Sequence, residues 1–576
     1  MVSDAMNPRR RKKQRNRKPV SCWPCRERKV RCDRGTPCAT CKRRGHTSLC
    51  TITSPSQPNG EELALHGLTP HRHVELVQGD SYYSLVADTT YMNDERGEGL
   101  LVALLNRVAA RLEPTHETDD ATREKIFLGQ NCAANFFRAL GAENPTTPLL
   151  PSGVAIESAF GLSNRTALHP FGSLWSNAGD VSLKNVLQSL PAVETSVAFE
   201  SRLCEFLQSL GDADVVRALD LAANGDSFHD AAWYGVLFGV LACGCQFHEC
   251  EVAADRILRA RVFVAGAFEC LRLANLFGMP SEATIQAQLL IQLTIANDAN
   301  PGMAWSLLGT TSQNAQSIGL HLNITTSIEW DAAIHPLWSA VWFLDSSLSL
   351  AFGRRPSSFV AGLDQRALHI GHSGCTTFPT FCSWTGAIHK LKLQWQLEQL
   401  DDVRASDLPI STTLRYLQSL VNLELIPPYG PKSQTKARTI HQRIEQLVSL
   451  IHIRHFKAEI HRVAALCCVM EAGRRIEHLE SMIQSLKELT AAYCTLKPLS
   501  VTMANSWPIL SATVSSALLL SGIHYTLERS MPPEIIKLIQ ILDRENTGHD
   551  YGAAGLRHPA YTDSLAALQY LSTNCH

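Results

Sequence analysis

The chain has 576 residues, of which 45% are hydrophobic and 19% are charged, so it is not too polar to bury a sizeable core. Its net charge of −1 hides an asymmetry. Residues 1–50 carry 16 Lys and Arg against 3 Asp and Glu (+13), whereas the rest of the chain carries 37 against 51 (−14). A basic end on an acidic body predicts a polyanionic partner for residues 1–50 alone.

No secretory or membrane-spanning segment is visible in the sequence. The N-terminus is charged and lacks an apolar region of the kind found in signal peptides. The longest apolar stretches, 236–245 and 509–520, are shorter than the ~18 apolar residues of a transmembrane helix. We therefore expect an intracellular protein with no membrane partner, in which cysteines stay reduced.

Residues 1–21 form a basic tail with no hydrophobic pattern. Eight Lys and Arg fall between positions 9 and 18. Such a run cannot pack against itself, and we expect it to be disordered until it meets phosphate or an import receptor. Nuclear import together with nonspecific DNA contact is the favoured interpretation, and a solvated tail without a partner is the alternative.

Six cysteines follow within 29 residues: Cys22, Cys25, Cys32, Cys38, Cys41 and Cys50. Two C-x-x-C pairs are present, and each places two thiolates on one tight turn, which is half of a tetrahedral zinc site. Six thiolates are too many for one such site and too few for two separate ones. Two zinc ions can share them if two sulfurs bridge. The alternative, a disulfide knot, belongs to secreted chains.

The spacing of these cysteines resembles the fungal six-cysteine binuclear zinc cluster family of transcription factors. The run C-R-E-R-K-V-R-C at 25–32 and Pro37 in the third gap carry the same resemblance. It implies two Zn²⁺ ions. Cys22 and Cys38 would bridge both ions, Cys25 and Cys32 would complete one site, and Cys41 and Cys50 would complete the other.

Two short helices are expected, one after each C-x-x-C pair, with the first over residues 26–31. The resemblance implies that the end of this helix enters the major groove of double-stranded DNA and reads a CGG-type triplet. Arg28 and Lys29 stand at the base-reading positions, where both side chains can reach guanine O6 and N7. Phosphate contacts, which fix the register without reading sequence, are expected from Arg26, Arg31, Lys42, Arg43 and Arg44.

Residues 51–125 are predicted to form a linker with a short helix. Many family members place a coiled coil after the cluster, but no heptad run here lasts the three or four repeats required. The nearest candidate is 95–112, with one apolar face formed by Leu101, Leu105, Val108 and Leu112. We favour a helix packed on the body of the protein over a dimer seam. A homodimer, and with it the spacing of DNA half-sites, is left open.

The rest of the chain is predicted to be helical. Residues 126–190 form a variable segment with a helical pattern at 126–140. From residue 191, apolar residues recur every three or four positions, which predicts helices over 199–210, 231–247, 256–277, 283–295 and 303–320. The predicted fold class is mostly all-α, with a small N-terminal binuclear zinc cluster of two short helices and a large α-helical regulatory domain.

A second resemblance covers residues 301–323 and 337–356. The motifs A-W-S-L-L-G at 304–309 and A-Q-S-I-G-L-H at 315–321 are similar to the fungal transcription factor middle homology region. So is the stretch from Trp338 through Asp345 to the G-R-R-P of 353–356, although the family has G-R-P-P there and a basic run before the tryptophans. The resemblance implies a middle homology domain over 191–365 and a C-terminal helical region over 366–576.

Two further groups combine metal-ligand residue types. The first is Cys243, Cys245, His248 and Cys250, and the second is His452, His455 and His461. We interpret the cysteines as core residues, because their flanks are apolar, and the histidines as core or solvated. No phosphate-binding loop, dinucleotide fingerprint, nucleophile elbow or H-E-x-x-H motif appears, and we predict no enzymatic activity.

The predicted function is zinc-dependent, sequence-specific DNA binding that regulates transcription by RNA polymerase II in the nucleus. Activation of a metabolic or secondary-metabolite gene set is favoured, because activators outnumber repressors in the family that the chain resembles. The alternative is a ligand-sensing or protein-interaction regulator, which could be a repressor, in which DNA contact is secondary. The partners considered besides DNA are the transcription machinery and a small-molecule effector.

Overall fold

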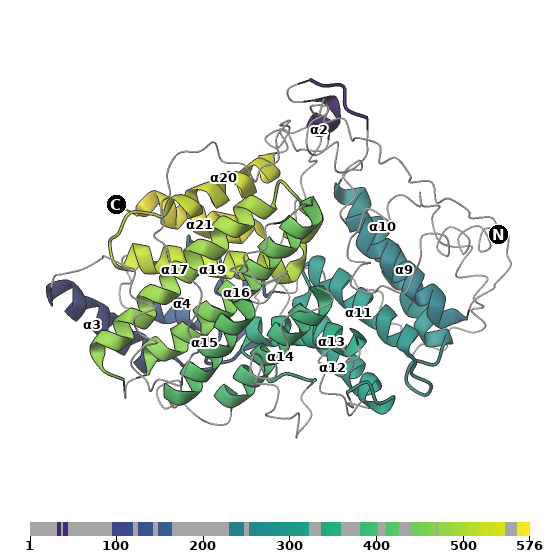
Figure 1. The fold of residues 1–576 in the computed structure, drawn as a ribbon, viewed down its shortest axis with the longest axis horizontal. Helices are drawn as coiled ribbons and strands as arrows, with labels where there is room; N and C mark the ends of the chain where they lie inside the picture. Colours follow the sequence, from purple (N-terminus) through teal and green to yellow (C-terminus); the bar gives the residue numbers. More distant parts are fainter. Residues whose placement is uncertain are drawn as a thin grey trace, which may run out of the picture. The chain divides into compact units, whose positions relative to one another are not determined.

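Helices dominate the described part of the chain, and Figure 1 shows their arrangement. The computed structural model describes residues 31–35, 38–43, 95–118, 125–141, 148–163, 230–246, 253–321, 336–358, 381–400, 410–425, 437, 439–467, 470–547 and 561–575. The chain divides into two units, Met1–Thr69 and Pro70–His576. Within the described residues, the predicted fold class of a mostly all-α chain is confirmed.

The first unit contains one described helix, α2 (Ala39–Arg43). A short helix was predicted after the second C-x-x-C pair, and α2 begins earlier, directly after Cys38 and inside that pair. Most of the helix predicted over 26–31 lies outside the described residues.

The second unit begins with α3 (Glu95–Arg111), whose apolar face packs inside the same unit. Leu101, Leu105, Val108 and Leu112 are all buried, and α3 contacts α4 (Ala133–Gly141), α16 (Ile440–Leu466) and α17 (Ala472–Leu496). The preference for a packed helix over a dimer seam is therefore confirmed for these four side chains.

A short β-hairpin precedes α4 and corrects the helix predicted over 126–140. Strand β1 (Thr115–Thr118) pairs antiparallel with β2 (Lys125–Leu128), and Thr115 lies opposite Leu128. Ile126 and Leu128 are buried whereas Phe127 is 38% exposed, which is the two-residue alternation of a strand. The helix itself begins only at Ala133, and α5 (Ile156–Ala159) follows.

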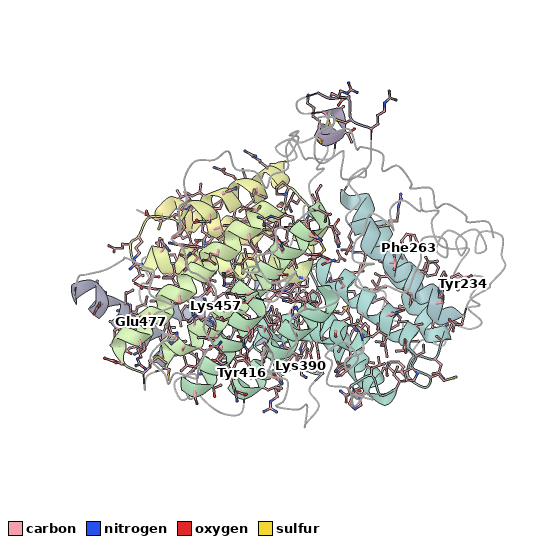
Figure 2. All side chains as sticks on the ribbon, in the orientation of Figure 1. Tyr234, Phe263, Lys390, Tyr416, Lys457 and Glu477 are labelled. Atoms are coloured by element: carbon pink, nitrogen blue, oxygen red, sulfur yellow. The ribbon has the colours of Figure 1, made fainter. Side chains whose placement is uncertain are left out.

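Five helices form the next part of the unit: α9 (Ala231–Gln246), α10 (Ala253–Leu273), α11 (Glu282–Asn297), α12 (Pro301–Ser317) and α13 (Pro336–Phe352). They confirm the helices predicted from residue 231 onward, whereas the one predicted over 199–210 lies outside the described residues. Helix α9 is buried nearly all round, and a Cβ on Gly239 would lie 2.8 Å from Leu290 of α11. Figure 2 labels Tyr234 and Phe263, which contribute α9 and α10 side chains to this core.

The C-terminal part adds α14 (Phe381–Leu400), α15 (Ile410–Leu425), α16, α17, α18 (Val501–Asn505), α19 (Trp507–Thr526), α20 (Pro533–Thr547) and α21 (Thr562–Asn574). The long helices α16 and α17 pack against each other, and α19 contacts both of them as well as α4, α13 and α21 (Figure 1). Helix α19 is long and apolar enough to cross a membrane, but most of it is buried, as in the core helix of a soluble fold.

The motifs of the second resemblance contact one another at the end of α13. The guanidinium of Arg354 lies over the Trp305 ring of α12, with its Cζ 4.6 Å from the ring centroid. Gly353 has a φ of 64° and ends α13, and its backbone approaches Gly129 so closely that a Cβ there would lie 1.8 Å from the Gly353 oxygen. These motif residues therefore hold α12, α13 and the hairpin together.

Asp345 fixes the segment that follows. Its carboxylate is fully buried and accepts the backbone N–H of Ser358 at 2.6 Å and the Ser349 hydroxyl at 2.8 Å. Burial raises the pKa of Asp345, and the bonds from Ser358 and Ser349 act in the opposite direction. The aspartate of the family motif is thus a structural residue in this chain.

Candidate metal centre and nucleic-acid interface

Three of the six predicted zinc ligands are described, and the fold brings them together. Cys38 and Cys41 are buried, and Cys32 packs against them as a partly buried residue. The donor atoms of Cys32, Cys38 and the neighbouring Asp33 all lie within 4.8 Å of one another. Among the described residues, this is the one group of three or more metal-ligand side chains that converges in this way.

Backbone N–H groups point at the sulfurs of this cluster. The N–H of Cys41 donates to Cys38 Sγ at 3.3 Å, and the N–H of Arg34 donates to Cys32 Sγ at 3.4 Å. Backbone N–H groups of this kind are suited to surround a metal-bound sulfur. The contact with Cys38 follows from the helix, because Cys38 precedes α2 and Cys41 lies in its first turn. The contact with Cys32 joins two residues that are two positions apart in the loop before α2.

Asp33 closes the loop between Cys32 and Cys38. Its two carboxylate oxygens accept the backbone N–H of Ala39 at 3.1 and 3.0 Å, which satisfies a free donor at the start of α2. The bond from Ala39 lowers the pKa of Asp33, which keeps the carboxylate ionised. The sequence interpretation missed this residue, although an aspartate shortly before a short helix is itself a capping signal.

The loop also contains a backbone reversal next to Asp33. Arg34 has a φ of 66°, in the left-handed region that non-glycine residues rarely adopt, and Gly35 follows it. In addition, the Thr40 hydroxyl donates to the Arg31 carbonyl at 3.1 Å, which ties α2 to the chain before Cys32. The positions of Cys32 and Cys38 are therefore set by several local bonds.

The predicted DNA-contact residues are described only in part. Arg31 and Lys42 are exposed, as phosphate contacts must be, and Arg43 is the last residue of α2. The remaining predicted residues of this site lie outside the described residues: Cys22, Cys25, Cys50, Arg26, Arg28, Lys29 and Arg44.

The other candidate metal ligands belong to the core of the second unit. Cys243 and Cys245 are buried, and Cys243 Sγ lies 3.0 Å from the Thr294 hydroxyl. His452 and His461 are buried as well. The interpretation as core residues is confirmed for these four, whereas His248 and Cys250 lie outside the described residues.

Two protein-family models match the chain. The fungal Zn(2)-Cys(6) binuclear cluster domain matches residues 20–59, which include the cluster just described, and the fungal specific transcription factor domain matches residues 234–365. The chain therefore contains a segment similar to each of these two domains of fungal transcription factors. The second match covers α9 to α13 with the Trp305, Asp345 and Arg354 contacts.

Three similar proteins are named as transcription factors or as a transcriptional regulatory protein. An uncharacterized transcriptional regulatory protein of Schizosaccharomyces pombe is 22% identical over 412 residues, which are 65% of this chain and 51% of that protein. Transcription factor lepE of Aspergillus flavus is 41% identical over 61 residues, 11% of this chain and 7% of its own. The pyrrolocin cluster transcription factor fsdR of a fungal species is 48% identical over 46 residues, 8% of this chain and 6% of its own. The chain thus spans about half the length of the first relative and less than a tenth of the other two.

Proposed function

We propose that this chain is a zinc-dependent, sequence-specific DNA-binding transcription factor that acts in the nucleus on genes read by RNA polymerase II. The observation that carries the proposal is the convergence of Cys32, Cys38 and Cys41 inside the segment that matches the binuclear cluster model. The charge of +13 on residues 1–50 supports a nucleic acid as the partner of this segment. A regulator of this kind has no catalytic role.

Two Zn²⁺ ions are proposed for the cluster. The described thiols fit zinc, because they are close together, at least partly buried, and supplied with N–H donors. Cys22 and Cys38 would bridge both ions, with Cys25 and Cys32 on one and Cys41 and Cys50 on the other. When bound, the ions supply folding free energy that a segment this short cannot obtain from an apolar core.

In the proposed DNA interface, some basic residues read bases and others contact phosphates. Arg28 and Lys29 would read a CGG-type triplet in the major groove, because both side chains can donate to guanine O6 and N7. Arg26, Arg31, Lys42, Arg43 and Arg44 would contact phosphates, and the exposure of Arg31 and Lys42 supports that role for those two.

Alanine substitution should separate base reading from phosphate contact. Arg28→Ala or Lys29→Ala should reduce the preference for a CGG duplex over a scrambled duplex by about 1–3 kcal/mol. Lys42→Ala should weaken binding to both duplexes alike and lower the salt slope by about one. Fluorescence-anisotropy titrations at several salt concentrations measure both quantities. Full CGG preference in both the Arg28 and the Lys29 variants would refute their assignment as base-reading residues.

The target genes are proposed from the relatives and not from the structure. The name of one relative ties it to the pyrrolocin cluster, which supports activation of a secondary-metabolite gene set here. Homodimerisation is a prediction that the packed face of α3 does not support, since its leucines are used within one chain. The domain boundaries at residues 21, 50, 125, 190 and 365 are likewise proposals, based on the sequence.

The second candidate function is a ligand-sensing or protein-interaction regulator, which could be a repressor, in which DNA contact is secondary. One observation favours ligand sensing, namely a polar cavity with a buried lysine inside the second unit, Pro70–His576, which we call the helical unit. A reporter gene driven by CGG sites distinguishes activation from repression.

A further inference from the structure

Two cavities lie inside the helical unit and share His452 and Pro508 as lining residues. We call the first, of about 30 Å³, the polar cavity; its polar lining residues are Ser347, Lys392, His452, His455, Glu459, Ser511 and Ser515. We call the second, of about 60 Å³, the apolar cavity; its main apolar lining residues are Leu289, Leu290, Leu293, Phe343, Leu344 and Val448. The two cavities therefore adjoin at His452 and Pro508.

Lys392 of α14 is the unusual residue of the polar cavity. Its side chain is only 2% exposed, and it has no hydrogen-bond or ion-pair partner among the described residues. Burial lowers the pKa of Lys392 to about 7, and the charge of Glu459 acts in the opposite direction. A buried ammonium group without a partner is costly, so a lysine in this position points to a ligand that neutralises it.

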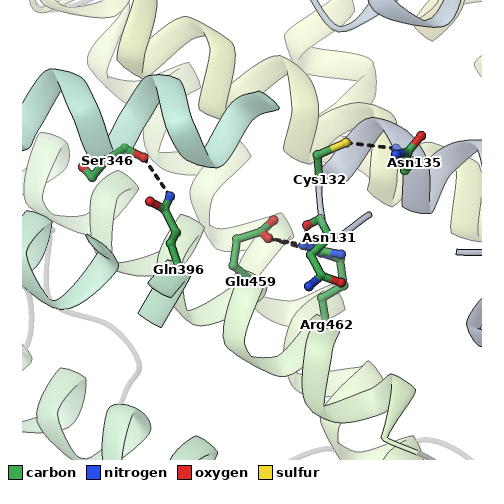
Figure 3. A network of polar contacts seen from close by, with 7 residues as sticks. All are labelled: Asn131, Cys132, Asn135, Ser346, Gln396, Glu459 and Arg462. Carbon is green, nitrogen blue, oxygen red and sulfur yellow. Dashed lines mark hydrogen bonds and ion pairs between the residues drawn. The ribbon is translucent and has the colours of Figure 1, made fainter. Parts of the chain in front are cut away.

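The nearest carboxylate does not serve as that partner. Glu459 binds Arg462 one turn along α16, with its Oε2 at 2.5 Å from Arg462 Nη2 (Figure 3). Because Arg462 already neutralises Glu459, the charge of Lys392 is the uncompensated one. The polar cavity is therefore suited to an anion.

The other groups around Lys392 are uncharged at pH 7. His389 on α14 and His452 and His455 on α16 are neutral, because burial lowers the pKa of each, that of His455 to about 3. The lining residues from α4, α5, α13 and α19 carry no charge. Imidazoles and serine hydroxyls can donate or accept hydrogen bonds, so they can complete the coordination of a small anion.

We propose that the helical unit binds a short monocarboxylic acid, with its carboxylate beside Lys392, His452 and His455 and its alkyl chain in the apolar cavity. A cavity needs about 10–15 Å³ to hold one water, so the two cavities, of about 30 and 60 Å³, have room for several non-hydrogen atoms and suit a small carboxylic acid. The class of ligand follows from one uncompensated cation next to an apolar chamber. This effector site is independent of which DNA sequence the cluster reads.

The test compares butyrate with butyramide, a neutral molecule of nearly the same shape. For the full-length chain at pH 7, 10 mM sodium butyrate should raise the thermal unfolding midpoint, and butyramide should leave it unchanged. Isothermal titration calorimetry then gives the dissociation constant. The butyrate affinity should fall by about tenfold per pH unit above pH 7, as Lys392 loses its proton.

Two lysines of the same helix provide the variant and its control. Lys392→Met should remove the response to butyrate and raise the stability of the unliganded chain, because it removes a buried charge without leaving a hole. Lys390→Met should keep the response, since Lys390 lies outside the cavity lining, with Nζ 5.4 Å from the centroid of the Trp342 ring (Figure 2).

Three results would each overturn the proposal. They are an equal response of the wild-type chain to butyramide, a butyrate response that survives Lys392→Met, and no response of the wild-type chain to butyrate at pH 7. The proposed site lies within the helical unit, so the butyrate response of the full-length chain does not depend on zinc or DNA binding. A loss of CGG recognition in a separate assay would refute the proposed function and leave this site intact.

Discussion

Lowering the pH from 7 to about 5 should unfold the helical unit. Burial lowers the pKa of six described histidines: His389, His452, His455, His461, His478 and His524. In the unfolded chain each would take up a proton near pH 6.5, whereas in the folded chain His455 and His478 do so only at about pH 3 and about pH 4. Protons therefore bind preferentially to the unfolded state below pH 6.5.

The size of this effect follows from proton linkage. Each such histidine removes roughly 1.4 kcal/mol of stability per pH unit between about pH 6.5 and its folded pKa. Six together give an upper limit of roughly 8 kcal/mol per pH unit, against a total stability of ~5–15 kcal/mol for a typical domain. Asp345 acts in the opposite direction, because burial raises its pKa, but it is one group against six. Lys392 is charged in both states below pH 6 and adds nothing to this slope.

Urea unfolding at pH 8, 7, 6 and 5 measures the loss, with fluorescence of the buried tryptophans Trp338, Trp342, Trp384 and Trp395 as the signal. His478→Gln should reduce the slope by the share of one histidine. His441→Asn is the matched control, because His441 lies at the surface with 36% of its side chain exposed. A stability that stays constant from pH 7 to pH 5 would contradict the assignment of these histidines as neutral, buried groups.

Replacing Arg462 with methionine should destabilise the helical unit by about 3–5 kcal/mol. Arg462 is 1% exposed, and it donates to Glu459 Oε2 and to the Asn131 carbonyl, while its Cζ lies 5.7 Å from the centroid of the Phe136 ring (Figure 3). Methionine fills much of the volume but leaves the Glu459 carboxylate buried and without its partner. The loop before α4 would also lose its link to α16.

A double-mutant cycle shows how much of this cost comes from the stranded carboxylate. The double variant Arg462→Met with Glu459→Gln should recover part of the loss, because no buried charge is left unpaired. Arg415→Met provides the comparison, since Arg415 forms an ion pair with Glu398 in which both side chains are at least 36% exposed. That change should cost ~1 kcal/mol or less. An equal cost for Arg462→Met and Arg415→Met would contradict the buried-pair account.

The helices could be predicted from the sequence where one apolar face repeats over many turns. Helices α9 to α12 have this periodicity and appear where it predicted them. The hairpin could not be predicted in the same way, because β2 is only four residues long and continues into the apolar pattern of α4. In such a short segment, hydrogen bonding to β1 decides the structure, and the apolar pattern of the segment itself does not show this pairing.

The two candidate sites also differ in how far they could be predicted from the sequence. The zinc cluster is visible in the sequence because its ligands are close together along the chain and their spacing is set by local turns. The Lys392 cavity is not visible, because its lining comes from α4, α5, α13, α14, α16 and α19, and each residue alone reads as an ordinary helical position. Taken one by one, the histidines of α16 were interpreted as core or solvated residues, and His452 and His461 are buried. Their clustering with Lys392 appears only when the helices pack.

The most direct test of the zinc-cluster account is to measure the number of bound zinc ions and the affinity for a CGG duplex on the same protein. Native mass spectrometry of the full-length chain should find two zinc ions, and Cys38→Ser should lose both ions together with binding to a CGG duplex, because Cys38 would bridge them. Cys132→Ser changes a buried thiol of the helical unit and should keep both zinc and DNA binding. Full-affinity CGG binding by Cys38→Ser, or by a wild-type chain stripped of zinc, would contradict the account.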